Sequence, residues 1–190
     1  MLRFVVGLLL VGHGTRKLCG WFGGGGLVGT AWYFRSIGYW PPRLMAGLAG
    51  GAELLGGACL AMGFLTPLAA AAVIGMMFSA AVAVHWRNGV WAIDNGYEYP
   101  LVIGAVAAAL GFTGPGAASL DAWFGHGGAS IASGAFAVVC GLVVGSAVLF
   151  TRTLAPSSAV PAPKSRSSGD SAPEIADRHG GRLQPLRVLR

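Results

Sequence analysis

The chain has 190 residues, of which 54% are hydrophobic and only 11% are charged, and its formal net charge at pH 7 is +6. Soluble domains carry about 25% charged residues, so this composition argues against a soluble globular protein and indicates a membrane protein. The basic excess does not indicate nucleic-acid binding, because basic and aromatic residues do not interleave in the C-terminal segment that carries most of it.

Long apolar runs predict an all-α, polytopic membrane helix bundle. A helix that spans a bilayer needs about 20 mostly apolar residues. Four runs reach or nearly reach this length, and a fifth, shorter run spans if Tyr97 and Glu98 lie at the membrane interface. We therefore expect five spanning helices, over residues 2–18, 44–65, 67–86, 99–113 and 131–150.

The first predicted helix has one feature of a signal peptide, since Arg3 precedes an apolar core. However, His13, Arg16 and Lys17 follow that core, where a signal peptide carries the small residues of its cleavage site. We therefore expect this helix to be retained in the mature protein.

The glycine-rich run WFGGGGLVG, residues 21–29, follows no strand and lacks the Lys-Ser/Thr end of a phosphate-binding loop. We expect a flexible turn at the membrane surface there. Signatures of catalytic centres, such as HExxH or a serine elbow, do not occur in the sequence. The three cysteines lie on separate segments without a CxxC pair. The sequence therefore predicts neither a self-contained active site nor a metal site.

Glu53 lies in the middle of the second predicted helix, which is otherwise apolar and rich in glycine. Helical spacing places Ala46, Gly50 and Gly57 on the same face, and small residues let helices approach closely in lipid. We expect the carboxyl group to point into the bundle. Ionisable groups inside a membrane are functional candidates; the alternative is a protonated Glu53 that joins two helices by a hydrogen bond.

Four other ionisable residues, His13, Lys17, His85 and Glu98, are expected to share the cytoplasmic half of the bundle, with Glu53 somewhat deeper. Such a cluster can relay protons or hold a polar headgroup such as a quinone ring, and an ordinary polar network at helix ends is the alternative. Two histidines on separate helices can also ligate a haem. The sequence leaves the cofactor open: a quinone fits such a cluster, and haem is disfavoured because the depth and facing of the two histidines are not fixed.

Two turn motifs are predicted at the opposite end of the bundle. In GFLTP, Thr66 is the expected N-cap of the third helix and Pro67 its first residue. After the fourth helix, glycines around a proline end the helix, and Ser119 or Asp121 is expected to cap a short interfacial helix. The motif residues are Thr66, Pro67, Gly114, Pro115, Gly116, Ser119 and Asp121.

The last predicted helix carries Gly141 and Gly145 as a GxxxG pair, with Gly134 two turns earlier. A stripe of small residues packs closely against another helix in lipid. That helix can belong to the same chain or to a second subunit of a homo-oligomer, and the sequence leaves both open.

Basic residues predict the orientation of the bundle. Of the 13 Lys and Arg residues, only Arg3 falls on one side of the five predicted spans. The positive-inside rule then places the N-terminus outside and the C-terminal tail in the cytoplasm.

The tail, residues 152–190, is rich in Pro, Ser, Ala and Arg and has almost no aromatic residues. Such a composition cannot bury enough apolar surface to fold, so we expect disorder. Its basic excess predicts attraction to anionic lipid headgroups.

The stretches RFVVGLLLVGHGTRKL, GGAELLGGACLAMGFLTPLAA, NGYEYPL and GPGAASLD resemble, in this order, four blocks of the DoxX family. The resemblance covers about residues 1–125. It implies a small multi-pass protein of the bacterial plasma (inner) membrane with a four-helix core. It also implies a link to redox systems, because the family is named after a subunit of a terminal quinol oxidase. Related members belong to thiosulfate:quinone oxidoreductase, and others resemble membrane partners of thiol-stress enzymes.

Three regions follow from this resemblance: a DoxX-like core over 1–125, an additional transmembrane helix over 126–151, and the tail over 152–190. The function that the resemblance favours is an accessory subunit of a quinone- or thiol-linked membrane redox complex. A small proton or solute transporter and a structural anchor for a soluble partner are the alternatives. The expected partners are the lipid bilayer and an oxidoreductase or other protein, and the additional helix makes the transfer of any family interface doubtful.

Overall fold

The computed structural model describes residues 1–154, so the part of the predicted tail that covers 155–190 lies outside the described residues. No strand occurs within 1–154, and the predicted all-α fold class is confirmed. The helices are α1 (Leu2–Cys19), α2 (Gly26–Ser36), α3 (Pro42–Met62), α4 (Thr66–Ala80), α5 (Glu98–Thr113), α6 (Leu120–Trp123) and α7 (Ile131–Phe150). Helix α4 continues through the π-helical turn η2 (Ala81–His85) and the 3-10 turn η3 (Trp86–Asn88).

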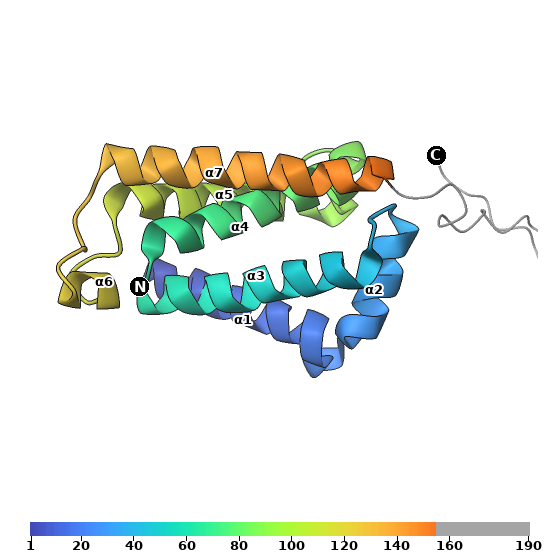
Figure 1. Cartoon of the computed structure of the whole chain (residues 1–190), viewed down its shortest axis with the longest axis horizontal. Helices are drawn as coiled ribbons and strands as arrows, with labels where there is room; N and C mark the ends of the chain where they lie inside the picture. The colour runs from blue at the N-terminus through green and yellow to red at the C-terminus, as the bar shows by residue number, and fades with distance from the viewer. Residues whose placement is uncertain (155–190) are drawn as a thin grey trace, which may run out of the picture.

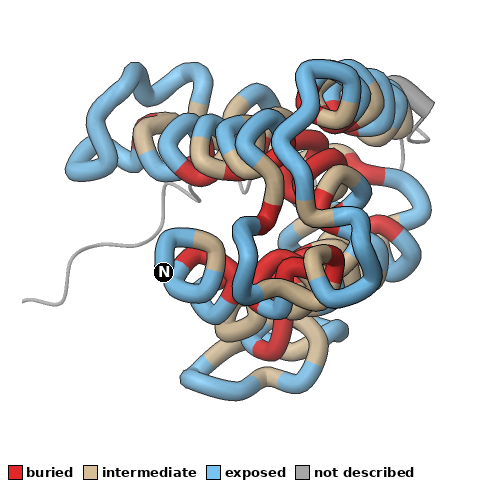
Figure 2. Tube along the Cα trace, turned by 90° about the vertical axis from the view of Figure 1, so that its left-hand side faces the viewer, coloured by how far each residue is buried: buried red, intermediate tan, exposed pale blue. Residues whose placement is uncertain are grey.

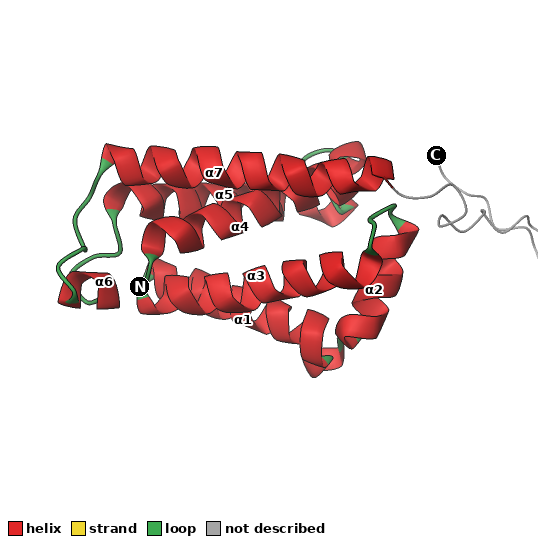
Figure 3. Ribbon diagram, in the orientation of Figure 1, coloured by secondary structure: helices red, strands yellow, loops and turns green. Residues whose placement is uncertain are grey.

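The five long helices lie side by side in two layers (Figure 1). Helices α1, α2 and α3 pack together in one layer, and α4, α5 and α7 form the other. The N-terminus and α6 lie at one end of the bundle, here called the α6 end, while α2 and the end of α7 lie at the opposite, α2 end (Figure 1). Loops are confined to these two ends (Figure 3), and buried residues lie on the inward-facing sides of the helices (Figure 2).

Within residues 1–154, three stretches are long and apolar enough to cross a membrane: Pro42–Met62, Thr66–Asn88 and Ile131–Phe150. The remaining two predicted spans are helices that run alongside them. Helix α1 has 18 residues but includes Arg3, Arg16 and Lys17, and α5 is a shorter apolar helix of 16 residues. At 1.5 Å per residue, α5 is about 24 Å long, somewhat less than the roughly 30 Å of a bilayer core.

Glycines on α1 and α3 let these two helices touch through their backbones. A Cβ atom at Gly57 would lie 2.7 Å from the carbonyl oxygen of Gly7, and one at Gly14 would lie 2.6 Å from the amide of Leu54. The face of α3 that carries Ala46, Gly50, Glu53 and Gly57 is buried, as the helical spacing predicted. This close contact holds Glu53 against α1.

We expect Gly57→Ala to lower the free energy of unfolding by about 1–3 kcal/mol, the usual cost of overpacking a tight core. The new methyl group has no flexible side chain to displace, because backbone atoms of α1 lie next to it. Gly51→Ala is the matched control in the same helix, since a Cβ atom there meets nothing within 4 Å. Unfolding of the detergent-solubilised variants in SDS, followed by circular dichroism, measures both, and equal stabilities would contradict the packing argument.

The glycine stripe of α7 packs against α4 of the same chain. A Cβ atom at Gly141 would lie 2.8 Å from the carbonyl oxygen of Ala71, and one at Gly145 would lie 2.6 Å from that of Gly75. The Ser79 hydroxyl also donates to the Gly145 carbonyl, at 3.0 Å. The sequence left open whether this stripe packs against a helix of the same chain or of a second subunit, and the structure shows packing within the chain.

The prediction of a flexible turn over residues 21–29 is wrong in its second half, because α2 begins at Gly26. Residues Trp21–Gly23 form a 3-10 turn, and the chain then folds back onto the end of α1. There, the Thr30 hydroxyl donates to the Lys17 carbonyl at 3.0 Å, and the backbone of Gly24 lies so close to Arg16 that a side chain would not fit. The glycines permit close approach and do not make the segment a simple turn.

Candidate functional site

A cavity of about 720 Å³ lies between the two layers at the α2 end, with walls from α1, α2, α3, α4, η2 and α7. Helices α3 and α4 touch near the turn that joins them, where a Cβ atom at Gly56 would lie 3.6 Å from Val73. Farther from this turn the facing residues are small, among them Ala49, Ala52 and Gly75, and they line the cavity. The cavity therefore opens where the two layers stop touching.

The polar residues in the cavity wall are predominantly basic or aromatic. His13, Arg16 and Lys17 come from α1, and His85 comes from η2. No Asp or Glu lines the cavity within residues 1–154. The other polar lining residues are Thr30, Tyr33, Tyr39, Ser79 and Asn95. The remaining walls are apolar, so the cavity has the mixed character of a site for an amphipathic small molecule.

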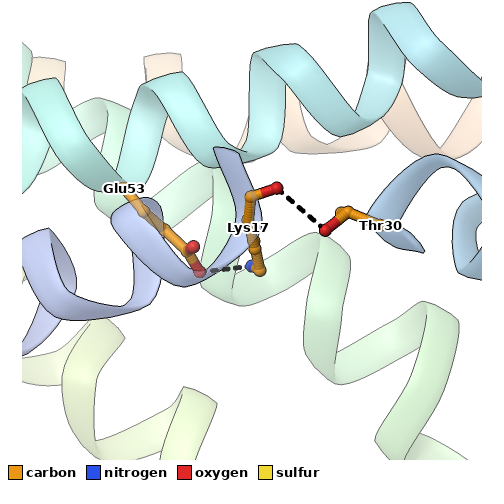
Figure 4. Close-up of polar contacts among 3 residues, drawn as sticks. All are labelled: Lys17, Thr30 and Glu53. Carbon is orange, nitrogen blue, oxygen red and sulfur yellow. Dashed lines mark hydrogen bonds and ion pairs between the residues drawn. The ribbon is translucent and has the colours of Figure 1, made fainter. Parts of the chain in front are cut away.

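Glu53 does not line the cavity itself, but it forms an ion pair with Lys17, which does. The Lys17 Nζ atom is 2.5 Å from Glu53 Oε1, and Figure 4 shows this ion pair together with the Thr30 bond that fixes the Lys17 backbone. Glu53 is only 3% exposed, whereas the Lys17 side chain is 30% exposed. The second oxygen, Oε2, is buried and has no hydrogen-bond partner among the described residues. The buried carboxylate thus depends on one partner that itself faces the cavity.

His13 and Tyr99 connect the two layers beside this pair. Their rings lie 5.7 Å apart at an angle of 42°, so the α1 histidine contacts the first turn of α5. His13 also lines the cavity, which leaves part of its ring available to a molecule inside.

His85 and Glu98 are held by the loop between η3 and α5. His85 Nδ1 lies 2.7 Å from the carbonyl oxygen of Asn95 and donates to it, which leaves Nε2 as the free ring nitrogen. Glu98 Oε2 accepts a hydrogen bond of 2.8 Å from the amide of Ala92. His85 lines the cavity and Glu98 does not.

The structure thus divides the five ionisable residues that the sequence grouped together. His13, Lys17 and His85 line one cavity, Glu53 pairs with Lys17 behind it, and Glu98 serves the loop. No group of three His, Cys, Asp or Glu side chains within 1–154 is arranged to hold a metal ion. Sequence reasoning missed Tyr33 and Tyr39 as lining residues, because tyrosines outside the predicted spans are ordinary at a membrane interface.

The turn motifs form a separate structural cluster at the α6 end. The carboxylate of Asp121 accepts hydrogen bonds from the amides of Leu65 and Thr66, at 2.8 and 2.9 Å. The prediction that Thr66 is the N-cap of its helix is therefore wrong. Thr66 is already helical, Leu65 precedes it with φ 47°, and the capping carboxylate comes from α6. Ser119 caps α6 itself, as predicted, because its Oγ accepts from the amide of Ala122 at 3.1 Å.

Arg3 completes this cluster, a role that the sequence did not reveal. Its guanidinium donates to the carbonyl oxygens of Pro115 and Ala118 and, at 3.3 Å, to that of Ala61. The glycines on either side of Pro115 have φ of 74° and 83°, a region that only glycine adopts without strain, so the loop turns back toward Arg3. One feature of the sequence could have indicated this role: Arg3 is the only basic residue predicted on the outer side of the membrane.

Burial raises the pKa of Asp121, but the hydrogen bonds from Thr66 and Leu65 and the nearby His126 outweigh it and hold the pKa below its ordinary value of 3.8. The carboxylate therefore stays ionised while it caps α4. None of the seven motif residues lines the cavity at the α2 end.

Comparison with known proteins supports the resemblance seen in the sequence. The model of the DoxX family matches residues 1–86, a segment that contains α1 to η2 and hence most of the cavity wall. No curated protein and no solved structure matches the chain.

Proposed function

We propose that this chain, in which residues 1–86 match the model of the DoxX family, is a membrane protein of that family and an accessory subunit of a quinone-linked membrane redox complex. In this proposal the cavity between the two layers holds the quinone. The observation that carries it is the cavity itself, whose volume of about 720 Å³ lies within the range of roughly 300–1,000 Å³ that is common for small-molecule sites.

The lining suits a quinone in two respects. Small apolar side chains such as Ala49, Ala52 and Val144 offer space and apolar surface for a flat ring and the start of its chain. The carbonyl oxygens of a quinone need hydrogen-bond donors, and Lys17 and Tyr33 supply N–H and O–H groups in the same cavity.

Proton exchange is the second requirement, because reduction of a quinone to a quinol takes up two protons together with two electrons. The imidazole of His13 lines the cavity, and the Lys17–Glu53 pair joins the wall to a buried carboxylate. In this proposal the pair and the histidine exchange protons with the ring, and the partner oxidoreductase exchanges the electrons. A proton or solute path through Glu53, the alternative, would first require its release from Lys17.

We propose further that the α2 end faces the cytoplasm of a bacterial cell and that the membrane is the plasma membrane. Most basic residues of 1–154 lie near this end, in α1's last turn, α2, the start of α3, η3 and η5, whereas Arg3 lies at the α6 end. The positive-inside rule favours this orientation.

The test is purification of the full-length chain from native membranes in a mild detergent, followed by extraction and mass spectrometry of bound quinone. We expect about one quinone per chain, and roughly tenfold less in Ala49→Phe, because the ring fills the cavity. The matched control is Leu55→Phe in the same helix, at a side chain that is 67% exposed. It is expected to keep the wild-type content.

Two outcomes would reject this function. A wild-type chain free of quinone and without a co-purifying oxidoreductase excludes the quinone-linked subunit, and proton flux into proteoliposomes that Glu53→Gln abolishes would favour the transporter instead. Equal quinone content in Ala49→Phe and wild type would show that the quinone binds outside this cavity.

A further inference from the structure

The two layers meet again at the α2 end, through Arg152, the second residue after α7. Arg152 lies in the 3-10 turn η5 (Thr151–Leu154). Its Nε atom donates to the carbonyl oxygen of Ile37 at 2.9 Å, and its guanidinium carbon lies 5.6 Å from the centre of the Tyr39 ring. Ile37 and Tyr39 belong to the loop between α2 and α3, and both line the cavity. Arg152 therefore connects the α7 side of the cavity to its α2–α3 side.

A neighbouring contact strengthens this connection. The Thr151 hydroxyl lies 3.6 Å from the sulfur of Met45, which also lines the cavity. Tyr39 is only 4% exposed, and burial raises its pKa while the charge of Arg152 lowers it. The cation thus lies over a ring that is largely withdrawn from water, where a cation–π contact is most favourable.

The opposite end of the bundle is held together by hydrogen bonds between helices and loops. There, Asp121 caps the turn between α3 and α4, and Arg3 ties α1 to the loop after α5. Separation of the layers at the cavity therefore requires a hinge at the α6 end and the loss of the Arg152 contacts at the α2 end.

The partners of Arg152 are exchangeable. The Ile37 carbonyl and the Tyr39 ring are both neutral groups. A guanidinium binds a phosphate more strongly, because the pair is charge-assisted and bidentate. Arg152 is partly exposed, and the chain that follows it, over residues 155–190, contains six Lys and Arg but three Asp and Glu.

We infer that Arg152 is a latch that closes the cavity at the α2 end, and that the phosphate of an anionic lipid releases it. With the latch closed, loop 37–41 stays against η5 and covers the cavity on the side of this loop. With Arg152 bound to a lipid phosphate, the loop is free to move and a ligand can enter or leave. The inference extends the proposed function by naming how access to the same cavity is regulated, but it does not depend on what the cavity binds.

The test measures access to the cavity without using quinone. In a full-length chain with Cys19, Cys59 and Cys140 replaced by alanine, Ala83→Cys places a single thiol in the cavity wall. Its rate of labelling by a water-soluble maleimide is compared with and without Arg152→Ala, in nanodiscs of neutral phosphatidylcholine. We expect labelling about tenfold faster without the latch. Arg87→Ala is the control, because Arg87 is an exposed cation in η3 that does not line the cavity.

The second arm replaces part of the phosphatidylcholine with anionic phosphatidylglycerol. We expect faster labelling when Arg152 is present and no change when it is alanine. Ala107→Cys, at a fully buried core residue outside the cavity, must stay unlabelled in both, which shows that Arg152→Ala is folded. Equal rates with and without Arg152 would overturn the latch, and a wild-type rate that does not change between zwitterionic and anionic lipid would overturn its release by anionic headgroups. Neither result bears on the quinone content of the purified chain, so the two proposals fail separately.

Discussion

Lys17→Gln is expected to lower the free energy of unfolding by roughly 3 kcal/mol, the low end of the cost of removing one partner from a buried ion pair. The change leaves the Glu53 carboxylate, which is 3% exposed, without its one hydrogen-bonding partner among residues 1–154. The cost is not higher because Lys17 is partly solvated in the wild type. SDS unfolding of the detergent-solubilised protein, followed by circular dichroism, measures the difference.

The matched variant is Glu53→Gln, which removes the charge from the buried partner and leaves Lys17 free to reach the solvated side of the cavity wall. We expect a clearly smaller loss, of about 1 kcal/mol. The double variant, Lys17→Gln with Glu53→Gln, is expected to recover most of the stability lost in Lys17→Gln, because no buried charge remains. A larger loss for Glu53→Gln than for Lys17→Gln would show that burial of Glu53 is not what makes the pair important.

Asp121→Ala is expected to destabilise the chain by roughly 2–4 kcal/mol. It leaves two amides without acceptors, that of Thr66 in a buried position and that of Leu65 in a partly buried one; an unsatisfied buried group costs about 1–3 kcal/mol, and the partly buried one costs less because water can reach it. Asp121→Asn keeps one acceptor oxygen and should lose less. Asp94→Ala is the control, because Asp94 is an exposed aspartate in the loop at the α2 end. A thermal unfolding series in detergent compares the three variants, and equal melting temperatures for the two alanine variants would contradict the role of the cap.

The pH dependence provides a second measurement of the same cap. The folded structure lowers the pKa of Asp121 below its ordinary value of 3.8, because the hydrogen bonds outweigh the effect of burial. Because the pKa of Asp121 is lower in the folded than in the unfolded protein, the carboxylate stabilises the folded state at every pH above the unfolded pKa of about 3.8. This contribution is lost as the pH falls from about 3.8 through the pKa of the folded state. The stability gap between wild type and Asp121→Asn should therefore be constant near neutral pH and shrink below about pH 4. A gap that does not change down to pH 2 would exclude an ionised cap.

Composition and periodicity were sufficient to predict the fold class and the positions of the five long helices. Both are local properties, since an apolar run of sufficient length must be a helix wherever its neighbours lie in a membrane. The buried face of α3 was predicted for the same reason: the helical repeat places Ala46, Gly50, Glu53 and Gly57 together, and all four are buried. The DoxX motifs, read in order, pointed to the family that the match over residues 1–86 supports.

The contacts that give the site its shape were decided by the tertiary structure alone. Lys17 and Glu53 lie 36 residues apart, the cap of α4 comes from a carboxylate 55 residues beyond Thr66, and Arg152 reaches a carbonyl 115 residues earlier. Each of these pairs depends on how whole helices are placed against one another, and no helical repeat encodes that placement. The cavity exists for the same reason, because it lies where the two layers of helices diverge, and the small residues that line it are, in the sequence, indistinguishable from those that pack tightly at Gly57 and Gly141.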